Sequence, residues 1–203
     1  MKIYLVRHGE TDWNRKHKLQ GQSDTELNSY GIELAEKTAE GLKDIPFDHA
    51  YASPLKRAVS TAEIILQNRP VSLHTDKRMM EMCFGDGEGA YLPDIMKNPE
   101  ESLYNFLKEP GQYVPPRHGE SFVELYKRSA DFAGEILPSL DNVCKNLLLV
   151  AHGAWNRSMI NPYLEIPVSQ FWEVNLPNCS VTVLEYQLGK ISVLEKSRVF
   201  YTI

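Results

Sequence analysis

Two histidines in this chain each follow an apolar run and precede a glycine. The run at 3–6 leads to His8 through Arg7, and the run at 146–151 leads directly to His152. An imidazole can act as a nucleophile, as an acid or base, or as a metal ligand, and a glycine after it lets the backbone approach a ligand closely. Either histidine alone is also compatible with a polar strand end or a helix cap. The repeated pattern favours a chemical site that both histidines share.

Strand and helix patterns alternate along the chain, and they predict the elements that must position these residues. Strands are predicted at 3–6, 49–52, 71–75 and 146–151, helices at about 28–42, 54–68 and 122–140, and a C-terminal hairpin at 180–187 and 190–197. Ser53 and Pro54 are interpreted as the N-cap and first residue of the second helix. This order predicts an α/β fold: a three-layer αβα sandwich with a mostly parallel central sheet and an antiparallel C-terminal hairpin.

The segment at 79–119 differs from the rest because it is rich in glycine, proline, methionine and aromatic residues. We predict that it forms a lid-like insertion, with loops around one short helix at about 93–107. A chain of 203 residues is long enough for one well-buried domain. We therefore expect a single domain over 1–203.

The predicted sheet also indicates where a ligand would bind. In open parallel sheets, ligands bind beyond the carboxyl ends of the strands. Arg7 and His8 come at the end of the first strand. We therefore expect both side chains to open onto a crevice, within reach of solvent, instead of being buried.

Four short segments carry further chemical side chains, in a fixed order along the chain. They are residues 5–11 with Trp13 and Asn14, residues 53–62, Glu81 with Gly85, Glu88 and Gly89, and His152 and Gly153 with Arg157. Together they resemble the motifs of the histidine phosphatase superfamily, in its phosphoglycerate mutase-like branch. An isolated Arg-His-Gly would be a weak signal, whereas four motifs in the right order, spread over nearly the whole chain, are specific.

The resemblance implies an enzyme, a phosphomonoester hydrolase that acts on a small phosphorylated metabolite. His8 would attack the phosphoryl group and become a phosphohistidine. Glu81 would give a proton to the leaving alcohol and later accept one from the attacking water.

The resemblance also implies which residues hold the phosphoryl group. Phosphoryl transfer requires positive charge around the equatorial oxygens, and Arg7, Arg57 and His152 match the family positions that supply it. Asn14 matches a position that donates a hydrogen bond to phosphate, and Gly153, which follows His152 in the fourth motif, is also expected to bind phosphate. The arginines take the place of a metal ion, so no metal or other cofactor is expected.

Three alternatives stay open at this point. A metal site of His8, Glu10 and His152 is disfavoured because the neighbouring arginines would repel a divalent cation. A phosphoglycerate mutase dependent on 2,3-bisphosphoglycerate is the main alternative, although the acid-bearing loop EMCFGDGEG resembles the phosphatase version more. The third is a phosphate-binding regulatory module without catalysis.

Two departures from the family pattern leave the substrate open. Trp155 stands where the family commonly has a small or aliphatic residue, so its ring either enters the pocket or packs beneath it. Gly87 stands where family phosphatases usually have tryptophan.

Overall composition limits the partners and the compartment. A net charge of −5 argues against nucleic-acid and membrane partners, which need a basic face. A homodimer stays possible. The three cysteines are odd in number and widely spaced, so they suggest neither a disulfide framework nor a zinc site. Without a signal-peptide pattern, we expect a cytoplasmic protein.

Overall fold

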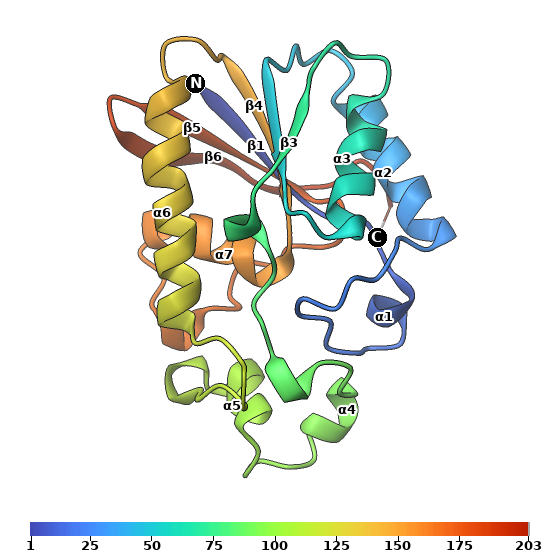
Figure 1. The fold of residues 1–203 in the computed structure, drawn as a ribbon, viewed down its shortest axis with the longest axis vertical. Helices are drawn as coiled ribbons and strands as arrows, with labels where there is room; N and C mark the ends of the chain where they lie inside the picture. Colours follow the sequence, from blue (N-terminus) through green and yellow to red (C-terminus); the bar gives the residue numbers. More distant parts are fainter. Residues whose placement is uncertain (203) are drawn as a thin grey trace.

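A six-stranded sheet runs through the middle of the computed structural model, which describes residues 1–202 (Figure 1). The strands are β1 (Lys2–Arg7), β2 (His49–Ala52), β3 (Leu73–Thr75), β4 (Asn146–Ala151), β5 (Val181–Gln187) and β6 (Lys190–Arg198). Their order across the sheet is β3-β2-β4-β1-β5-β6. The first four in this order are parallel, and β5 and β6 are antiparallel. The predicted mostly parallel sheet and C-terminal hairpin are confirmed.

Helices cover both faces of the sheet and complete the predicted αβα sandwich. They are α1 (Asp12–Arg15), α2 (Ser29–Gly41), α3 (Lys56–Leu66), α4 (Leu92–Ile95), α5 (Ser102–Lys108), α6 (Phe122–Leu140) and α7 (Gly153–Ile160). Helices α2 and α3 lie on one face, α6 and α7 on the other (Figure 1). None of the helices within residues 1–202 is long and apolar enough to cross a membrane.

Strand β4 lies in the interior of the sheet and carries the most hydrophobic run of the chain. Leu147 and Leu149 pack into the core on the α6 side, whereas Leu148 and Val150 pack into the core on the α3 side. All four side chains are fully buried. A strand covered on both faces cannot alternate between apolar and polar residues, so the uninterrupted run correctly predicted a central parallel strand.

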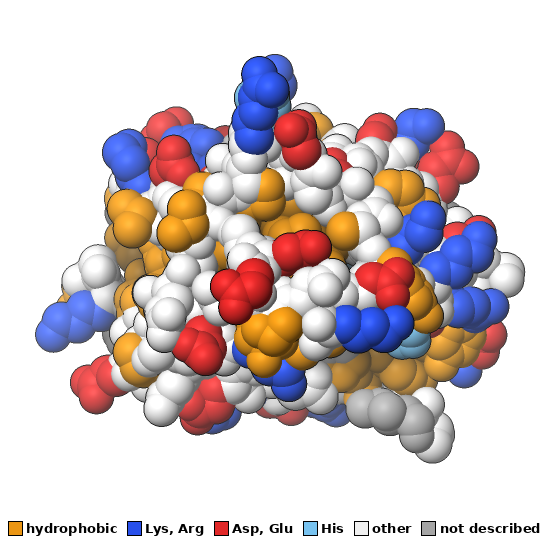
Figure 2. Space-filling view, turned by 90° about the horizontal axis from the view of Figure 1, so that it is seen from below, with side chains coloured by type: hydrophobic (Ala, Val, Ile, Leu, Met, Phe, Trp, Pro, Cys, Tyr) orange, Lys and Arg blue, Asp and Glu red, His pale blue; other side chains and the backbone are white. Residues whose placement is uncertain are grey.

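The segment at 79–119 lies beyond the carboxyl ends of the parallel strands, where α4 and α5 form the lower end of the molecule in Figure 1. The single helix predicted at 93–107 is wrong, because the chain forms α4 and α5 with a turn between them. Pro99 accounts for the break, since it disfavours helical backbone at Asn98 and has no N–H to donate. Figure 2 shows acidic and basic side chains intermixed over this end of the molecule.

Two other predicted boundaries need correction. The third strand is shorter than 71–75, because β3 begins at Leu73. Helix α3 begins at Lys56 and not at Pro54, with Leu55 as an extended N-cap residue. Ser53 Oγ accepts a hydrogen bond from Leu55 N, while the N–H of Lys56 is capped by Asp24 Oδ1 at 2.7 Å. The cap therefore comes from a distant loop, which local sequence does not reveal.

Candidate active site

The parallel pairing of β1 with β4 brings the two histidines together. Arg7 is the register partner of Ala151, and the N–H of His8 donates to the carbonyl oxygen of Ala151 at 2.9 Å. The ring centroids of His8 and His152 lie 5.1 Å apart. His8 is only 3% exposed and His152 is fully buried. The expectation that His8 lies in open reach of solvent is therefore wrong.

One nitrogen of the His8 ring is committed to the backbone. Nδ1 lies 2.7 Å from the carbonyl oxygen of Gly9. A carbonyl can only accept, so we assign the proton to Nδ1, which leaves the lone pair on Nε2. Burial, with the charges of Arg57 and Arg7 in addition, holds the pKa of His8 well below its usual range. The ring is therefore neutral at pH 7 and can act as a nucleophile.

His152 differs from the expectation that it supplies positive charge. Burial first, and then the nearby charge of Arg57, holds the pKa of His152 well below its usual range, so its ring is neutral. Neither ring nitrogen has a hydrogen-bond partner within residues 1–202. A buried imidazole with both nitrogens unpaired is suited to binding a ligand through a hydrogen bond.

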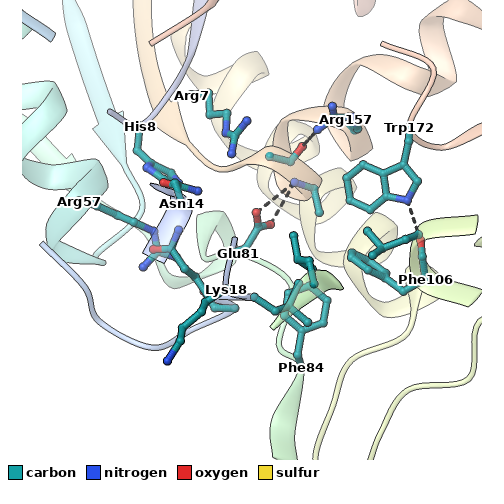
Figure 3. A pocket seen from close by; sticks show the side chains of 17 residues that line it. Arg7, His8, Asn14, Lys18, Arg57, Glu81, Phe84, Phe106, Arg157 and Trp172 are labelled. Atoms are coloured by element: carbon teal, nitrogen blue, oxygen red, sulfur yellow. Dashed lines mark hydrogen bonds between the residues drawn. The ribbon is translucent and has the colours of Figure 1, made fainter. Parts of the chain in front are cut away.

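A cavity of ≈ 220 Å³ opens beside His8. Figure 3 shows the side chains that line it. Every predicted site residue except His152 lines this cavity, namely Arg7, His8, Asn14, Arg57, Glu81 and Gly153. His152 contacts the His8 ring instead.

Backbone carbonyls, and not carboxylates, hold the two predicted arginines. Arg57 donates to the carbonyl oxygens of Ser23 and Gly21, each at 2.7 Å, and Arg7 donates to that of Leu176 at 2.6 Å. Burial lowers the pKa of Arg57 to about 10, so it stays charged at pH 7. Carbonyls fix the guanidinium groups without neutralising them, which makes the cavity a site for anions.

Asn14 is positioned by the short helix α1, which the sequence patterns did not predict. Its Oδ1 accepts from the backbone N–H and the hydroxyl of Thr11, both at 3.1 Å, in a capping box. The side-chain oxygen is thereby occupied. The NH₂ group of Asn14 is left as the donor toward the cavity.

Glu81 sits against the first turn of α7. Its carboxyl group accepts from the backbone N–H groups of Met82, Ala154 and Trp155 at 2.9–3.2 Å. A Cβ atom at Gly153 would lie 3.6 Å from Glu81 Oε2, in ordinary contact. The carboxyl group is therefore fixed at the wall of the cavity by backbone donors.

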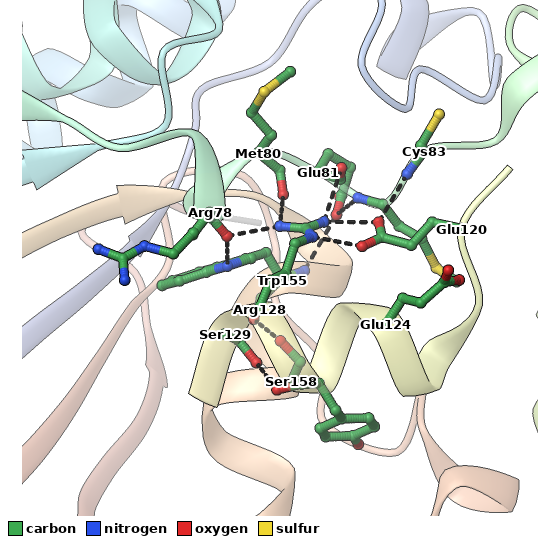
Figure 4. Close-up of polar contacts among 12 residues, drawn as sticks. Arg78, Met80, Glu81, Cys83, Glu120, Glu124, Arg128, Ser129, Trp155 and Ser158 are labelled. Carbon is green, nitrogen blue, oxygen red and sulfur yellow. Dashed lines mark hydrogen bonds and ion pairs between the residues drawn. The ribbon is translucent and has the colours of Figure 1, made fainter. Parts of the chain in front are cut away.

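Arg128 of α6 holds the backbone that carries Glu81 (Figure 4). Its guanidinium donates to the carbonyl oxygens of Arg78, Met80 and Glu81 at 2.6–3.1 Å. It also pairs with Glu120 at 2.5 and 2.8 Å, and both side chains are largely buried. These contacts of Arg128 were not predicted, because they join residues that are far apart in the sequence.

The structure shows the surroundings of Trp155 and Gly87, the two residues that depart from the family pattern. Trp155 is fully buried and packs beneath the cavity, where its Nε1 donates to the carbonyl oxygen of Arg78 at 2.6 Å. A Cβ atom at Gly87 would come within 2.8 Å of Leu103 Cδ1. Leu103 thus occupies the space that a larger residue at 87 would need.

Several cavity residues had no predicted role. Arg157 belongs to the fourth motif but was given no function there, and Lys18 and Trp172 lie outside the motifs. Trp172 Nε1 donates to the carbonyl oxygen of Phe106 on α5 at 2.6 Å, so the segment at 79–119 forms part of the wall. The remaining apolar lining is Leu19, Phe84, Leu92, Leu107 and Ala154.

The rival metal site is not assembled. Glu10 Oε1 accepts from Asn28 and Arg15 and is not grouped with the histidines. In the described part of the chain, no three His, Cys, Asp or Glu side chains are grouped so as to hold a metal ion.

Comparisons with known proteins show the family to which the chain belongs. The family model described as "Histidine phosphatase superfamily (branch 1)" matches residues 3–197. A probable phosphoglycerate mutase GpmB from Proteus mirabilis is 33% identical over 189 residues, covering 92% of this chain and 86% of that protein. Phosphoserine phosphatase 1 from Hydrogenobacter thermophilus is 29% identical over 195 residues, covering 96% and 91%. Among solved structures, Bacillus stearothermophilus YhfR has a TM-score of 0.89 at 28% identity, covering 96% of this chain and 95% of that chain.

Replacing Arg128 by methionine is expected to destabilise the fold by about 3 kcal/mol or more, because it leaves a largely buried carboxylate unpaired. The matched control is Lys127→Met on the same helix. Lys127 forms an exposed pair with Asp131, which should contribute less than about 1 kcal/mol. Urea unfolding measures both free energies. An equal decrease of the free energy of unfolding in the two variants would contradict the structural role assigned to Arg128.

The buried histidines predict a fall in stability in acid. Below the unfolded pKa of about 6.5, the unfolded chain binds protons at His8 and His152 while the folded chain does not, so the free energy of unfolding decreases as the pH falls. Each histidine contributes a slope of up to about 1.4 kcal/mol per pH unit. Urea unfolding between pH 5 and 8 should show a shallower slope for His152→Asn. The exposed His74→Asn should keep the wild-type slope, and an unchanged slope in His152→Asn would refute the prediction.

Proposed function

Because the chain belongs to the histidine phosphatase superfamily, branch 1, we propose that it hydrolyses a small phosphomonoester through a phosphohistidine on His8. One observation carries this proposal. A neutral imidazole, with its proton held on Nδ1 by Gly9, lines a cavity together with guanidinium groups that backbone carbonyls hold in place.

The first step forms the phosphohistidine. The Nε2 lone pair attacks phosphorus, the bond between phosphorus and the ester oxygen breaks, and the leaving oxygen takes a proton from the carboxyl group of Glu81. The Glu81 carboxyl group lies in the cavity wall, as a proton donor to the leaving group must. No metal is needed for this step, since the arginines stabilise the charge that spreads over the equatorial oxygens.

The second step returns the enzyme to its starting state. Water attacks phosphorus, Glu81 accepts a proton from it, and the bond between Nε2 and phosphorus breaks. Inorganic phosphate leaves, and His8 is again neutral with its proton on Nδ1.

Each remaining group has a separate task in binding the phosphoryl oxygens. Arg7 and Arg57 carry charge in a planar form that can grip two oxygens at once. Asn14 contributes its NH₂ group, and Gly153 keeps the wall free of a side chain. His152 contributes a neutral N–H to the phosphoryl group carried by His8, because its ring is uncharged and lies against the His8 ring.

A phosphoglycerate mutase is the second candidate, and the name of the Proteus mirabilis relative favours it. The first step is common to both reactions. They differ in what accepts the phosphoryl group from His8, which is water in the phosphatase and a second hydroxyl group in the mutase.

Replacing His8 by alanine is expected to lower the hydrolysis of p-nitrophenyl phosphate by a factor of about 10³ or more, as loss of a nucleophile does. Wild-type activity should persist in EDTA, and brief incubation with ³²P-labelled substrate should leave acid-labile phosphate on the protein. His118→Ala, which removes an exposed histidine, is the matched control and should keep its label. Activity that EDTA abolishes and a divalent metal restores would overturn the mechanism. Absence of label with every ester tried would favour a binding module.

The choice between the two reactions is tested with 3-phosphoglycerate and a trace of 2,3-bisphosphoglycerate. We expect release of inorganic phosphate to exceed formation of 2-phosphoglycerate, measured by ³¹P NMR. Isomerisation faster than phosphate release would establish the mutase instead.

A further inference from the structure

Arg157 is a buried cation that the proposed phosphoryl transfer does not use. It is 7% exposed, and Nη1 donates to the carbonyl oxygen of Gly153 at 2.8 Å. Its Nε has no partner within residues 1–202. Its Cζ lies 4.8 Å from the centre of the Trp172 ring. A guanidinium has five N–H donors, and leaving a buried one such as Nε–H unpaired is costly.

No carboxylate is dedicated to this charge. A Cβ atom at Gly153 would lie 3.5 Å from Arg157 Nη1, 3.6 Å from Glu81 Oε2 and 3.7 Å from Arg7 Cζ. The charge of Glu81 acts on Arg7, Arg57 and Arg157. Its carboxyl group already accepts from three backbone N–H groups. Burial, reinforced by Arg7 and opposed by Glu81, lowers the pKa of Arg157 to about 9. Arg157 remains charged at pH 7, and no carboxylate among residues 1–202 pairs with it alone.

Arg157 also stands apart from the nucleophile. In Figure 3, His8 and Arg57 lie on one side of Arg7 and Glu81, and Arg157 and Trp172 lie on the other. All of them line the same cavity. An anion at Arg157 would therefore belong to the part of the substrate that leaves with the alcohol.

We propose that Arg157 binds a carboxylate of the substrate, so that the preferred substrate is a phosphorylated hydroxy or amino acid and not a phosphate ester of an uncharged alcohol. The proposal rests on the proposed phosphomonoesterase function. A planar guanidinium matches a carboxylate in a bidentate pair, and the Trp172 ring shields that pair from water. The cavity of ≈ 220 Å³ is below the size typical of drug-sized ligands, which restricts the acid to a small one.

The charge in the cavity supports a second anionic group. Its ionisable lining is Arg7, Lys18, Arg57, Arg157 and Glu81, and both histidines near it are neutral. When a phosphate dianion is bound, the positive charges of these side chains still exceed the negative charges. Glu81, followed by Asp24 and Glu88, offsets part of the charge of Arg57. Glu81 also offsets part of the charge of Arg157.

The test compares 3-phosphoglycerate with glycerol 3-phosphate, which differ by a carboxylate in place of a hydroxymethyl group. The quantity measured is the ratio of kcat/KM for the two compounds, with total turnover counted as phosphate release plus isomerisation. We expect the wild type to favour 3-phosphoglycerate by about tenfold or more, the discrimination that a hydrogen-bonded charged group typically provides. A misfolded fraction lowers both values equally and cancels in the ratio.

Three variants test which cation of the cavity recognises the carboxylate. Arg157→Met should lower the ratio about 10- to 100-fold, mainly through 3-phosphoglycerate, and Arg157→Lys should give an intermediate ratio because it keeps the charge without the planar fork. Lys18→Met is the matched control, since it removes another cation of the cavity, and it should change the ratio far less. An unchanged ratio in Arg157→Met, or a larger loss in Lys18→Met, would overturn the assignment.

Labelling of His8 separates this inference from the function on which it rests. Acid-labile phosphate on the wild type, without any preference for 3-phosphoglycerate, would overturn the carboxylate site and leave the phosphatase mechanism intact. No label with either compound or with p-nitrophenyl phosphate would overturn both.

Discussion

Strand β1 pairs with β4 in parallel along its whole length, and the last pair is Arg7 with Ala151. Because side chains alternate between the faces of a strand, a slip of one residue would turn every side chain to the opposite face. The register is fixed from both sides, since the apolar residues of β4 fill the cores on both faces of the sheet. The position of His8 beside His152 is thus a consequence of core packing, and the cavity is arranged around that pair.

Arginine has two different uses around this cavity. Arg7, Arg57 and Arg157 are held by backbone carbonyls, which fix their directions and leave their charges available. Arg128 is paired with Glu120, so its charge is neutralised and its remaining donors secure the backbone of the acid-bearing loop. The partner of each arginine therefore decides whether its charge stays available in the cavity or its donors support the backbone. Burial of the two imidazoles, reinforced by the charges of Arg57 and Arg7, keeps both rings neutral.

Periodic elements could be predicted from the sequence, and contacts between distant segments could not. Helix α6 and strand β4 have the predicted bounds, because their patterns reflect burial over many residues. The start of α3 was missed because Asp24 caps it from another loop, and the break between α4 and α5 follows from Pro99. The motifs located the residues of the cavity, but the burial and neutrality of His8 and His152 arise from tertiary packing.

The hydrogen bond from Trp172 to the carbonyl oxygen of Phe106 joins α5 to the ring that stacks on Arg157. Outward displacement of α5 would break this bond and release the indole, which changes the surroundings of the guanidinium at the same moment. The position of α5 is thereby linked through Trp172 to the surroundings of the Arg157 guanidinium. If Arg157 binds a carboxylate as proposed, movement of α5 and binding at Arg157 would each change the free energy of the other by the same amount.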